Sequence, residues 1–397
     1  MKILQDHLPK GWEIKKLGEI VDIINGRNQS AVISENGQYP IYGSAGNLMG
    51  YATDYLCEAG TTIIGRKGNI SNPIFIEERF WNVDTAFGLF PKNNYSPKFI
   101  NYLCQTIDFK SRNRGTTIPS LVKSDLLTID VPFISSLPEQ QRIVSILDEC
   151  FSAIDKAKAN AEQNLKNAKE LFESYLNTAF ENKVHGEKFE SLDSLCELIV
   201  DCEHKTAPTQ ETGYPSIRTS NIGKGELILE NVNRVSYETY IQWTRRAIPK
   251  AGDLILAREA PAGNIVVIPE NIEVCLGQRT VLLRPKNDRL ISKYLAYLIL
   301  SKEVQEILLS HSTGATVQHI NMKDIRAFKI YNLSNLKEQS SVVQKLDALK
   351  SETKKLESVY QRKIADLEEL KKSILQKAFR GELTSKGLVT NKNHGYE

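Results

Sequence analysis

The sequence has no long apolar segment, and nothing at its amino terminus resembles a secretory signal. Its longest apolar run, residues 294–300, is far too short to cross a bilayer. The first twelve residues lack the apolar stretch that a signal peptide needs. We therefore expect a soluble, cytoplasmic protein with no membrane partner.

Cysteine patterning is also missing. The six cysteines are scattered, without the spacing of a disulfide framework or of a paired CxxC zinc site, so we interpret them as reduced thiols. Cys196, Cys202 and His204 could supply three metal ligands, but the sequence offers no fourth ligand beside them. Ordinary packing of these residues is favoured, and no metal is expected.

Strong charge of one sign is absent as well, because the net charge is only +3 over 397 residues. Global charge therefore does not indicate a polyanionic partner, and any nucleic-acid signal must be local. The apolar fraction of 41% is enough for two globular cores in a chain of this length. Two domains are the starting expectation.

What the sequence does contain is a long internal repeat. Glu139-Gln140 matches Glu338-Gln339, a displacement of 199 residues, the difference between 338 and 139. The same displacement relates Ala179-Phe180 to Ala378-Phe379. Further upstream, residues 98–103 resemble residues 293–298 with altered spacing, so the loops there differ in length. The chain therefore consists of a variable domain and a fixed segment, each present twice.

The fixed segments have the pattern of long helices. Apolar or small residues recur in alternating steps of four and three, which is heptad spacing. From Pro138 to Glu181 such a helix would be roughly 65 Å long. The expected seam positions are Ile143, Leu147, Cys150, Ile154, Ala157, Ala161, Asn164, Ala168, Leu171 and Tyr175, and in the second copy Val342, Leu346, Leu349, Thr353, Leu356, Tyr360, Lys363, Leu367, Leu370 and Ile374.

A rod of this length needs a partner to cover its apolar seam. Each helix could simply pack on its neighbouring domain, but the equal length and shared pattern of the two favour pairing with each other. A two-fold axis exchanging the repeats would make the helices antiparallel and place the domains at opposite ends, so that one chain imitates a dimer on the local dyad of DNA. The expected fold is α/β (α+β), with two mixed domains and an antiparallel coiled coil.

Together these features resemble a known family, the specificity subunits of type I restriction-modification systems. The order and duplication of several short motifs carry the resemblance, which covers nearly the whole chain. The second domain departs from the first at 214–220 and 256–264, so its site residues are less closely defined. The motifs are residues 11–13, 17–20, 39–46, 64–69, 137–141 and 378–383.

The resemblance implies that this chain recognises DNA and that partner subunits carry out the chemistry. Each domain would read one half of a split target on double-stranded DNA, and the coiled coil would set the unread spacer. Two methyltransferase subunits and further restriction subunits would bind the chain, and S-adenosylmethionine, ATP and Mg would belong to those partners. The expected divisions are a first recognition domain at 1–136, helices at 137–183 and 336–383, a second recognition domain at 184–335 and a flexible tail at 384–397.

Polar and basic loops of the first domain are candidate DNA contacts. Arginine, asparagine and glutamine match the bidentate chemistry of guanine and adenine edges, while glycine-rich turns allow the backbone to approach phosphates. The alternative for each loop is a solvated turn. The candidates are Arg27, Asn28, Gln29, Ser44, Asn47, Arg66, Lys67, Asn69, Arg112 and Arg114.

The second domain offers counterparts. His311 and His319 are interpreted as structural histidines, and Arg258 and Glu259 could form an internal ion pair of little worth if exposed. The candidates are Lys205, Arg218, Ser220, Asn221, Arg258, Asn264, Gln278, Arg279 and the loop 311–318.

No catalytic constellation is found. Residues 60–67 resemble a phosphate-binding loop, but the lysine is displaced by one position and Gly68 follows it in place of Ser or Thr. Residues 72–75 resemble an adenine methyltransferase motif without its second proline. Two other function classes stay open, a scaffold that does not bind DNA and a self-sufficient nuclease or methyltransferase.

Overall fold

The structure, a computed structural model, describes residues 8–181, 183–310 and 319–383. The chain forms two compact units, unit 1 from residues 1–161 and 362–397 and unit 2 from residues 162–361. The expected tail at 384–397 and the candidate loop 311–318 lie outside the described residues. Within the described ranges, no helix combines the length and the apolar character that crossing a membrane requires.

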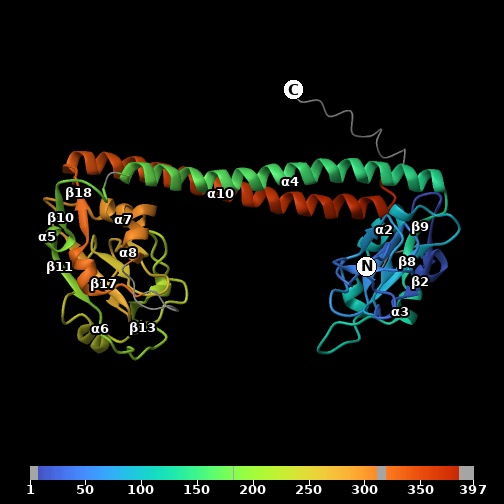
Figure 1. The fold of residues 1–397 in the computed structure, drawn as a ribbon, viewed down its shortest axis with the longest axis horizontal. Helices are drawn as coiled ribbons and strands as arrows, with labels where there is room; N and C mark the ends of the chain where they lie inside the picture. The colour runs from blue at the N-terminus through green and yellow to red at the C-terminus, as the bar shows by residue number, and fades with distance from the viewer. Residues whose placement is uncertain (1–7, 182, 311–318, 384–397) are drawn as a thin grey trace, which may run out of the picture. The chain divides into compact units, whose positions relative to one another are not determined.

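Unit 1 contains a four-stranded sheet in the order β2-β8-β5-β6, a three-stranded sheet in the order β4-β3-β7, and the pair β1-β9 (Figure 1). Its strands are β1 (Trp12–Lys16), β2 (Val21–Asn25), β3 (Tyr39–Tyr42), β4 (Leu48–Ala52), β5 (Thr61–Gly65), β6 (Ile74–Ile76), β7 (Trp81–Asn82), β8 (Ala86–Pro91) and β9 (Asp130–Ile134). Its shorter helices are α1 (Leu17–Ile20), α2 (Pro97–Gln105), the 3-10 helix η2 (Phe109–Arg112) and α3 (Lys123–Leu127).

Sequence explains these elements well. Every residue of the inner strand β5 is buried, as a strand covered on both faces requires. Helix α2 begins where the Ser96 side chain accepts a hydrogen bond from Phe99 N and Pro97 occupies the first turn. Phe99 then enters a core that also holds Trp12 and Phe379, so both ends of the described chain contribute to unit 1.

Unit 2 repeats this plan with sheets in the orders β11-β17-β14-β15 and β13-β12-β16, and the pair β10-β18. Its strands are β10 (Phe189–Ser191), β11 (Cys196–Asp201), β12 (Tyr214–Ile217), β13 (Arg234–Val235), β14 (Leu254–Ala257), β15 (Ile265–Val267), β16 (Cys275–Leu276), β17 (Thr280–Pro285) and β18 (Lys329–Tyr331). Its shorter helices are α5 (Leu192–Leu195), η3 (Thr219–Asn221), α6 (Tyr237–Trp243), α7 (Ser292–Leu300), α8 (Lys302–Ser310) and α9 (Met322–Ala327).

Two 44-residue helices, α4 (Leu137–Phe180) and α10 (Leu336–Phe379), each contribute to both units. In unit 1 the first part of α4 contacts the last part of α10, where Lys371 Nζ lies 2.8 Å from Asp155 Oδ1. In unit 2 the last part of α4 shares a core with the first part of α10. The helices are therefore antiparallel within each unit. The expected mixed α/β class with two paired long helices is confirmed.

The predicted heptad seam is correct over part of its length only. Ile143, Leu147 and Ala168 are buried as expected, but Leu171 is 52% exposed and Leu370 is 46% exposed. Beyond Ala168, side chains four residues apart point inward, Leu176 and Phe180 among them. The reason is that this end of α4 packs on the core of unit 2, whose broader surface replaces the narrow seam of a paired helix.

The repeated Glu-Gln motif joins each domain to its long helix through the glutamine. Gln140 is fully buried; its Oε1 accepts from Ser96 N at 2.8 Å, and its Nε2 donates to Ile134 O at 2.7 Å. Gln339 is also fully buried; its Oε1 accepts from Ile291 N, and its Nε2 donates to Ser334 O and to Arg289 O. Both glutamines therefore satisfy backbone groups that would otherwise be buried without partners.

Candidate nucleic-acid interface

In unit 1, two of the predicted loops leave the same edge of the four-stranded sheet. Strands β2 and β5 are antiparallel to β8, which lies between them, so both end beside the start of β8. Gly26 N donates to Ala86 O at 3.1 Å, and Arg66 N donates to Thr85 O at 2.8 Å. The segments that begin at Arg27 and Arg66 are thus held on either side of residues 85–86.

The other two predicted segments join this edge through backbone hydrogen bonds. Strand β3 is parallel to β7, and Arg27 N donates to Asn82 O, so the turn after β3 with Ser44 and Asn47 leaves beside the same strand. Gly68 N donates to Pro119 O, and Leu121 N donates to Arg66 O. The loop that follows Arg112 and Arg114 is thereby fixed against residues 66–68. We call these four segments edge 1.

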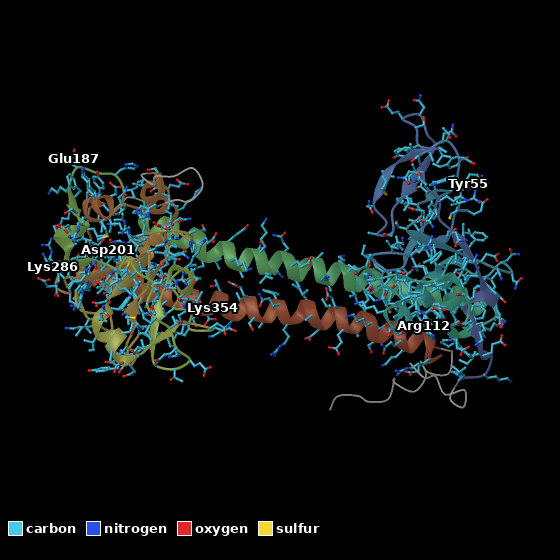
Figure 2. All side chains as sticks on the ribbon, turned by 90° about the horizontal axis from the view of Figure 1, so that it is seen from below. Tyr55, Arg112, Glu187, Asp201, Lys286 and Lys354 are labelled. Carbon is cyan, nitrogen blue, oxygen red and sulfur yellow. The ribbon has the colours of Figure 1, made fainter. Side chains whose placement is uncertain are left out.

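Edge 1 presents positive charge. Arg27, Arg66, Lys67 and Arg112 are exposed, and none of them has an ion-pair partner among the residues that the structure describes; Arg112 can be found in Figure 2. Arg114 differs, because its Nε lies 2.8 Å from Asp125 Oδ2 and this hydrogen bond raises the pKa of the guanidinium. Exposed, unpaired cations of this kind are suited to neutralising phosphates.

The remaining polar candidates of unit 1 belong to its turns. Asn28 Oδ1 accepts from Ser30 N, which folds the chain after β2, and Gln29 O accepts from Val32 N. Asn47 O accepts from Gly43 N at the β3–β4 turn. Asn69 follows Gly68 on an exposed tip. Their side chains share edge 1 with the cations.

Unit 2 repeats the framework of edge 1. Cys202 N donates to Thr280 O as Gly26 N does to Ala86 O, and Arg258 N donates to Arg279 O as Arg66 N does to Thr85 O. Ile320 N donates to Arg258 O, which matches the bond from Leu121 N to Arg66 O. The loops at the ends of β11, β12 and β14, with the residues that precede β17, therefore form an equivalent edge 2.

The structure divides the predicted residues of unit 2 into two groups. Lys205, Arg218, Ser220 and Arg279 are exposed, and Gln278 is half-buried. Asn221, Asn264 and Arg258 point into the fold and hold it together: Asn221 Nδ2 donates to Ile228 O, and Asn264 Nδ2 donates to Ile222 O. These three side chains were predicted as DNA contacts, and the structure gives each of them internal hydrogen-bond partners.

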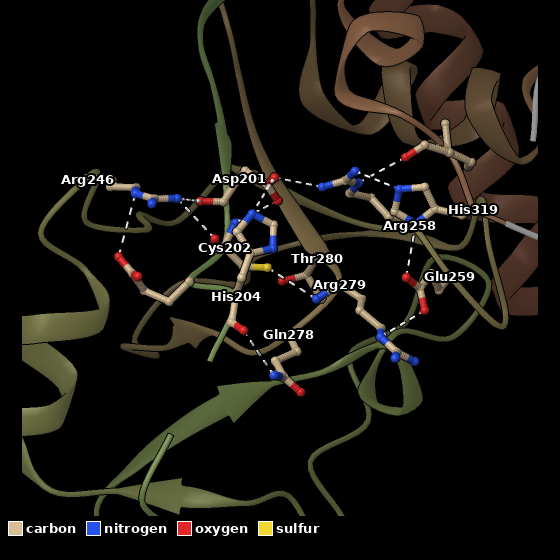
Figure 3. Close-up of polar contacts among 12 residues, drawn as sticks. Asp201, Cys202, His204, Arg246, Arg258, Glu259, Gln278, Arg279, Thr280 and His319 are labelled. Atoms are coloured by element: carbon tan, nitrogen blue, oxygen red, sulfur yellow. Dashed lines mark hydrogen bonds and ion pairs between the residues drawn. The ribbon is translucent and has the colours of Figure 1, made fainter. Parts of the chain in front are cut away.

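Arg258 has the most internal partners of the three (Figure 3). It is only 7% exposed, and its Nη1 lies 2.7 Å from Asp201 Oδ2, its Nε 2.9 Å from Ile320 O and its Nη2 2.9 Å from His319 Nε2. The possible ion pair with Glu259 is not formed. Glu259 instead bonds His319 Nδ1 at 3.0 Å and Arg279 Nε at 2.8 Å.

Sequence reasoning missed the acidic partners of edge 2. Asp201 ends β11 and Glu203 follows it, where Glu203 pairs with Arg245 and Arg246. As a result, Arg258 and Arg279 of edge 2 have carboxylate partners. Among the described residues, edge 2 therefore has two candidate cations without an ion pair, Lys205 and Arg218, whereas edge 1 has four. The available signal was an acidic residue at the end of one strand, Asp201, and an arginine at the end of another, Arg258. The sequence does not show that these two strand ends are neighbours, so the pair could not be predicted.

The cysteines considered as metal ligands are packed inside unit 2. Burial raises the pKa of the Cys196 thiol to about 12 and also raises that of Cys202, whose Sγ accepts a hydrogen bond from Arg279 N. Across the described ranges, no three His, Cys, Asp or Glu side chains are grouped as metal ligands. Within the segment 60–67, which resembled a phosphate-binding loop, residues 61–65 form the buried strand β5.

Comparison with known proteins shows which family this chain resembles. The family model described as "Type I restriction modification DNA specificity domain" matches residues 9–167 and 187–365. The chain is 23% identical to the Type I restriction enzyme EcoBI specificity subunit of Escherichia coli over 83% of this chain and 75% of that protein. It is 23% identical to the MjaVIII specificity subunit of Methanocaldococcus jannaschii over 96% of this chain and 95% of that protein.

Solved structures share the fold. A chain from work on complex assembly and conformational transition of the type I R-M system matches with a TM-score of 0.74 at 18% identity, over 95% of this chain and 99% of that one. The HsdS subunit from Thermoanaerobacter tengcongensis matches with a TM-score of 0.58 at 19% identity, over 95% and 98%. With two matched segments that together span most of its length, the chain belongs to the type I restriction modification DNA specificity family.

Proposed function

We propose that this chain selects the DNA target of a type I restriction-modification enzyme, with edge 1 reading one half of a bipartite site and edge 2 the other. The observation that carries the proposal is the duplicated framework: both edges use the same backbone hydrogen bonds and display different side chains. Two different half-sites on one duplex require two similar backbone frameworks that present different side chains to the bases.

The two edges divide affinity and selectivity differently in this proposal. The unpaired cations of edge 1, Arg27, Arg66, Lys67 and Arg112, supply phosphate contacts, and Asn28, Gln29 and Asn69 are available to base edges. Edge 2 offers Lys205, Arg218, Ser220, Gln278 and Arg279 beside several carboxylates. Edge 2 therefore contributes less non-specific attraction to DNA than edge 1.

The long helices set the distance between the half-sites in this proposal. Helices α4 and α10 have equal length and are antiparallel within each unit. A pair of rigid helices fixes the distance between the two reading domains, because each helix has a constant rise of about 1.5 Å per residue, whereas a flexible linker has a variable end-to-end distance. The proposed divisions are recognition domains at 1–136 and 184–335 with helical segments at 137–183 and 336–383.

The chemistry belongs to partner subunits in this proposal. Two methyltransferase subunits and further restriction subunits bind the chain, and S-adenosylmethionine, ATP and Mg²⁺ are held by them. The chain itself is a non-catalytic cytoplasmic scaffold. The curated relatives, which carry the name of type I restriction enzymes, support an assembly of this kind.

The experiment is a DNA-binding titration of the chain assembled with its methyltransferase subunits. We expect specific binding whose affinity falls steeply between about 50 and 200 mM salt, because phosphate contacts release counterions. Weak binding that does not respond to salt would favour a scaffold without DNA. Methylation or cleavage by the purified chain alone, with Mg²⁺ and S-adenosylmethionine, would contradict the non-catalytic assignment.

A further inference from the structure

Five side chains of unit 2 form a continuous series from the interior to the surface of edge 2 (Figure 3). Asp201 pairs with the buried Arg258, and Arg258 bonds His319. His319 bonds Glu259, and Glu259 pairs with Arg279, whose side chain is 62% exposed. The series runs from an acid through two basic residues and a second acid, and it ends on the exposed guanidinium of Arg279.

Donor and acceptor roles along the series follow from the arginine at its centre. A guanidinium has only donors, so His319 Nε2 accepts from Arg258 Nη2, and the imidazole proton lies on Nδ1. That proton is donated to Glu259 Oε1. Glu259 Oε2 is left for Arg279 Nε at 2.8 Å. Both carboxylate oxygens of Glu259 are therefore used, and its orientation is fixed from the interior.

The backbone of Arg279 is fixed as well. Its N–H donates to Cys202 Sγ at 3.2 Å, and its carbonyl accepts from Arg258 N at 2.9 Å. Its φ of +67° lies in the left-handed region, which a long side chain rarely adopts. Surrounding structure holds this conformation, and an observed strain of this kind points to a role for the side chain.

The contacts of Arg279 leave one edge of its guanidinium available to a ligand. Glu259 takes the Nε side, and the terminal Nη1–Nη2 edge points away from the carboxylate (Figure 3). Two parallel N–H donors on that edge match a pair of adjacent acceptors, and guanine presents O6 and N7 as such a pair in the major groove. A phosphate contact would gain little here, because Glu259 offsets the positive charge that attracts the backbone.

Resting on the proposed function, we propose that Arg279 reads a guanine in the half-site bound by unit 2, and that Glu259 and His319 are positioning residues for it. The equivalent residue of unit 1 is Thr85, whose carbonyl occupies the same place in the hydrogen-bond framework. Threonine has no guanidinium fork, so the two edges differ at this position.

The test compares base preference in wild type and variants of the full chain, assembled with its methyltransferase subunits, on duplexes randomised across both half-sites. Wild type is expected to require one guanine in the second half-site. Arg279→Ala and Arg279→Lys should each lower that preference about tenfold or more, because lysine keeps the charge but lacks the fork. All positions of the first half-site should be unchanged.

Glu259→Gln tests the positioning role. It should weaken the guanine preference several-fold while raising overall affinity, because a negative charge near DNA is removed. The matched control is Arg245→Ala, since Arg245 is also paired with a glutamate and 59% exposed, but it is not among the residues with positive φ. This control should leave the base preference intact.

Three results would overturn the inference: a second half-site without a required guanine, full guanine preference in Arg279→Lys, or a uniform loss of affinity in Arg279→Ala with a salt slope smaller by about 1. The last result is the signature of a phosphate contact. A wild-type complex without any base preference would instead overturn the proposed function.

Discussion

At the scale of single residues, the buried glutamine of each repeat holds a domain to its long helix. Gln140→Ala would leave Ser96 N and Ile134 O buried without partners. We expect the free energy of unfolding of unit 1 to fall by roughly 2–4 kcal/mol. Urea unfolding of the purified chain measures this, with the exposed neighbour in Gln141→Ala as the control. Equal losses in both variants would contradict the assigned role.

A second residue-scale prediction concerns pH. Glu226 Oε1 lies 2.5 Å from Lys354 Nζ and 3.4 Å from Lys350 Nζ, and the hydrogen bond to Lys354 holds the pKa of Glu226 below its ordinary value of 4.5. A lowered pKa in the folded state means that the unfolded chain binds more protons in this range. The contribution is therefore complete above about pH 5 and is lost as the pH falls through the lowered pKa.

The measurement compares wild type with Glu226→Gln. We expect the variant to be less stable by under about 1 kcal/mol near pH 6, because the Glu226 side chain is partly exposed. The difference should shrink near pH 3, where both chains lack the carboxylate charge. A difference that stayed constant or grew toward low pH would show that the ion pairs do not stabilise unit 2.

Residue-scale prediction from sequence was only partly possible. Arg27, Arg66 and Arg112 follow strand ends or precede turns, and the structure leaves them exposed as expected. Arg258 occupies the position equivalent to Arg66, yet it is buried. Its partners Asp201 and His319 are 57 and 61 positions away along the chain, and no local pattern indicates such contacts.

At the scale of elements, the long helices were the most predictable feature. Their heptad spacing and the 199-residue displacement are both visible in the sequence. The heptad pattern could not indicate where a long helix stops packing on the other long helix and begins to pack on a domain core. Leu171 and Leu370 were therefore wrongly placed on the seam. Apolar residues at two overlapping spacings are compatible with either environment, and tertiary packing decides between them.

The helices give the element-scale prediction. Inserting one heptad after Ala157 and one after Leu356, its equivalent 199 residues later, lengthens both helices by about 10 Å. We expect the spacer of the recognised target to grow by about three base pairs, with both half-sites unchanged. Methylation mapping of cells that carry the altered chain provides the readout.

The control is the insertion after Ala157 alone. Seven extra residues in one helix leave its apolar positions without matching partners, so this chain should lose stability or assembly and should not acquire a longer spacer. An altered half-site in the double insertion would contradict the proposal that the helices only set distance.

At the scale of the whole molecule, duplication explains both what was predictable and what was not. Repeated motifs indicated two domains of one design, and the sheets of the two units have matching strand orders. The pairing of Asp201, Glu203 and Glu259 with neighbouring cations, which makes edge 2 less positive than edge 1, was not predicted. Charge balance at an edge depends on which strand ends are adjacent, and only the folded sheet defines that.

Long-read mapping of DNA methylation in cells with and without this chain, in the presence of its methyltransferase partner, tests the central claim most directly. We predict a motif that appears only with the chain and consists of two different half-sites at a fixed separation. A continuous motif, two identical half-sites, or methylation that is the same without the chain would contradict reading by two unlike edges.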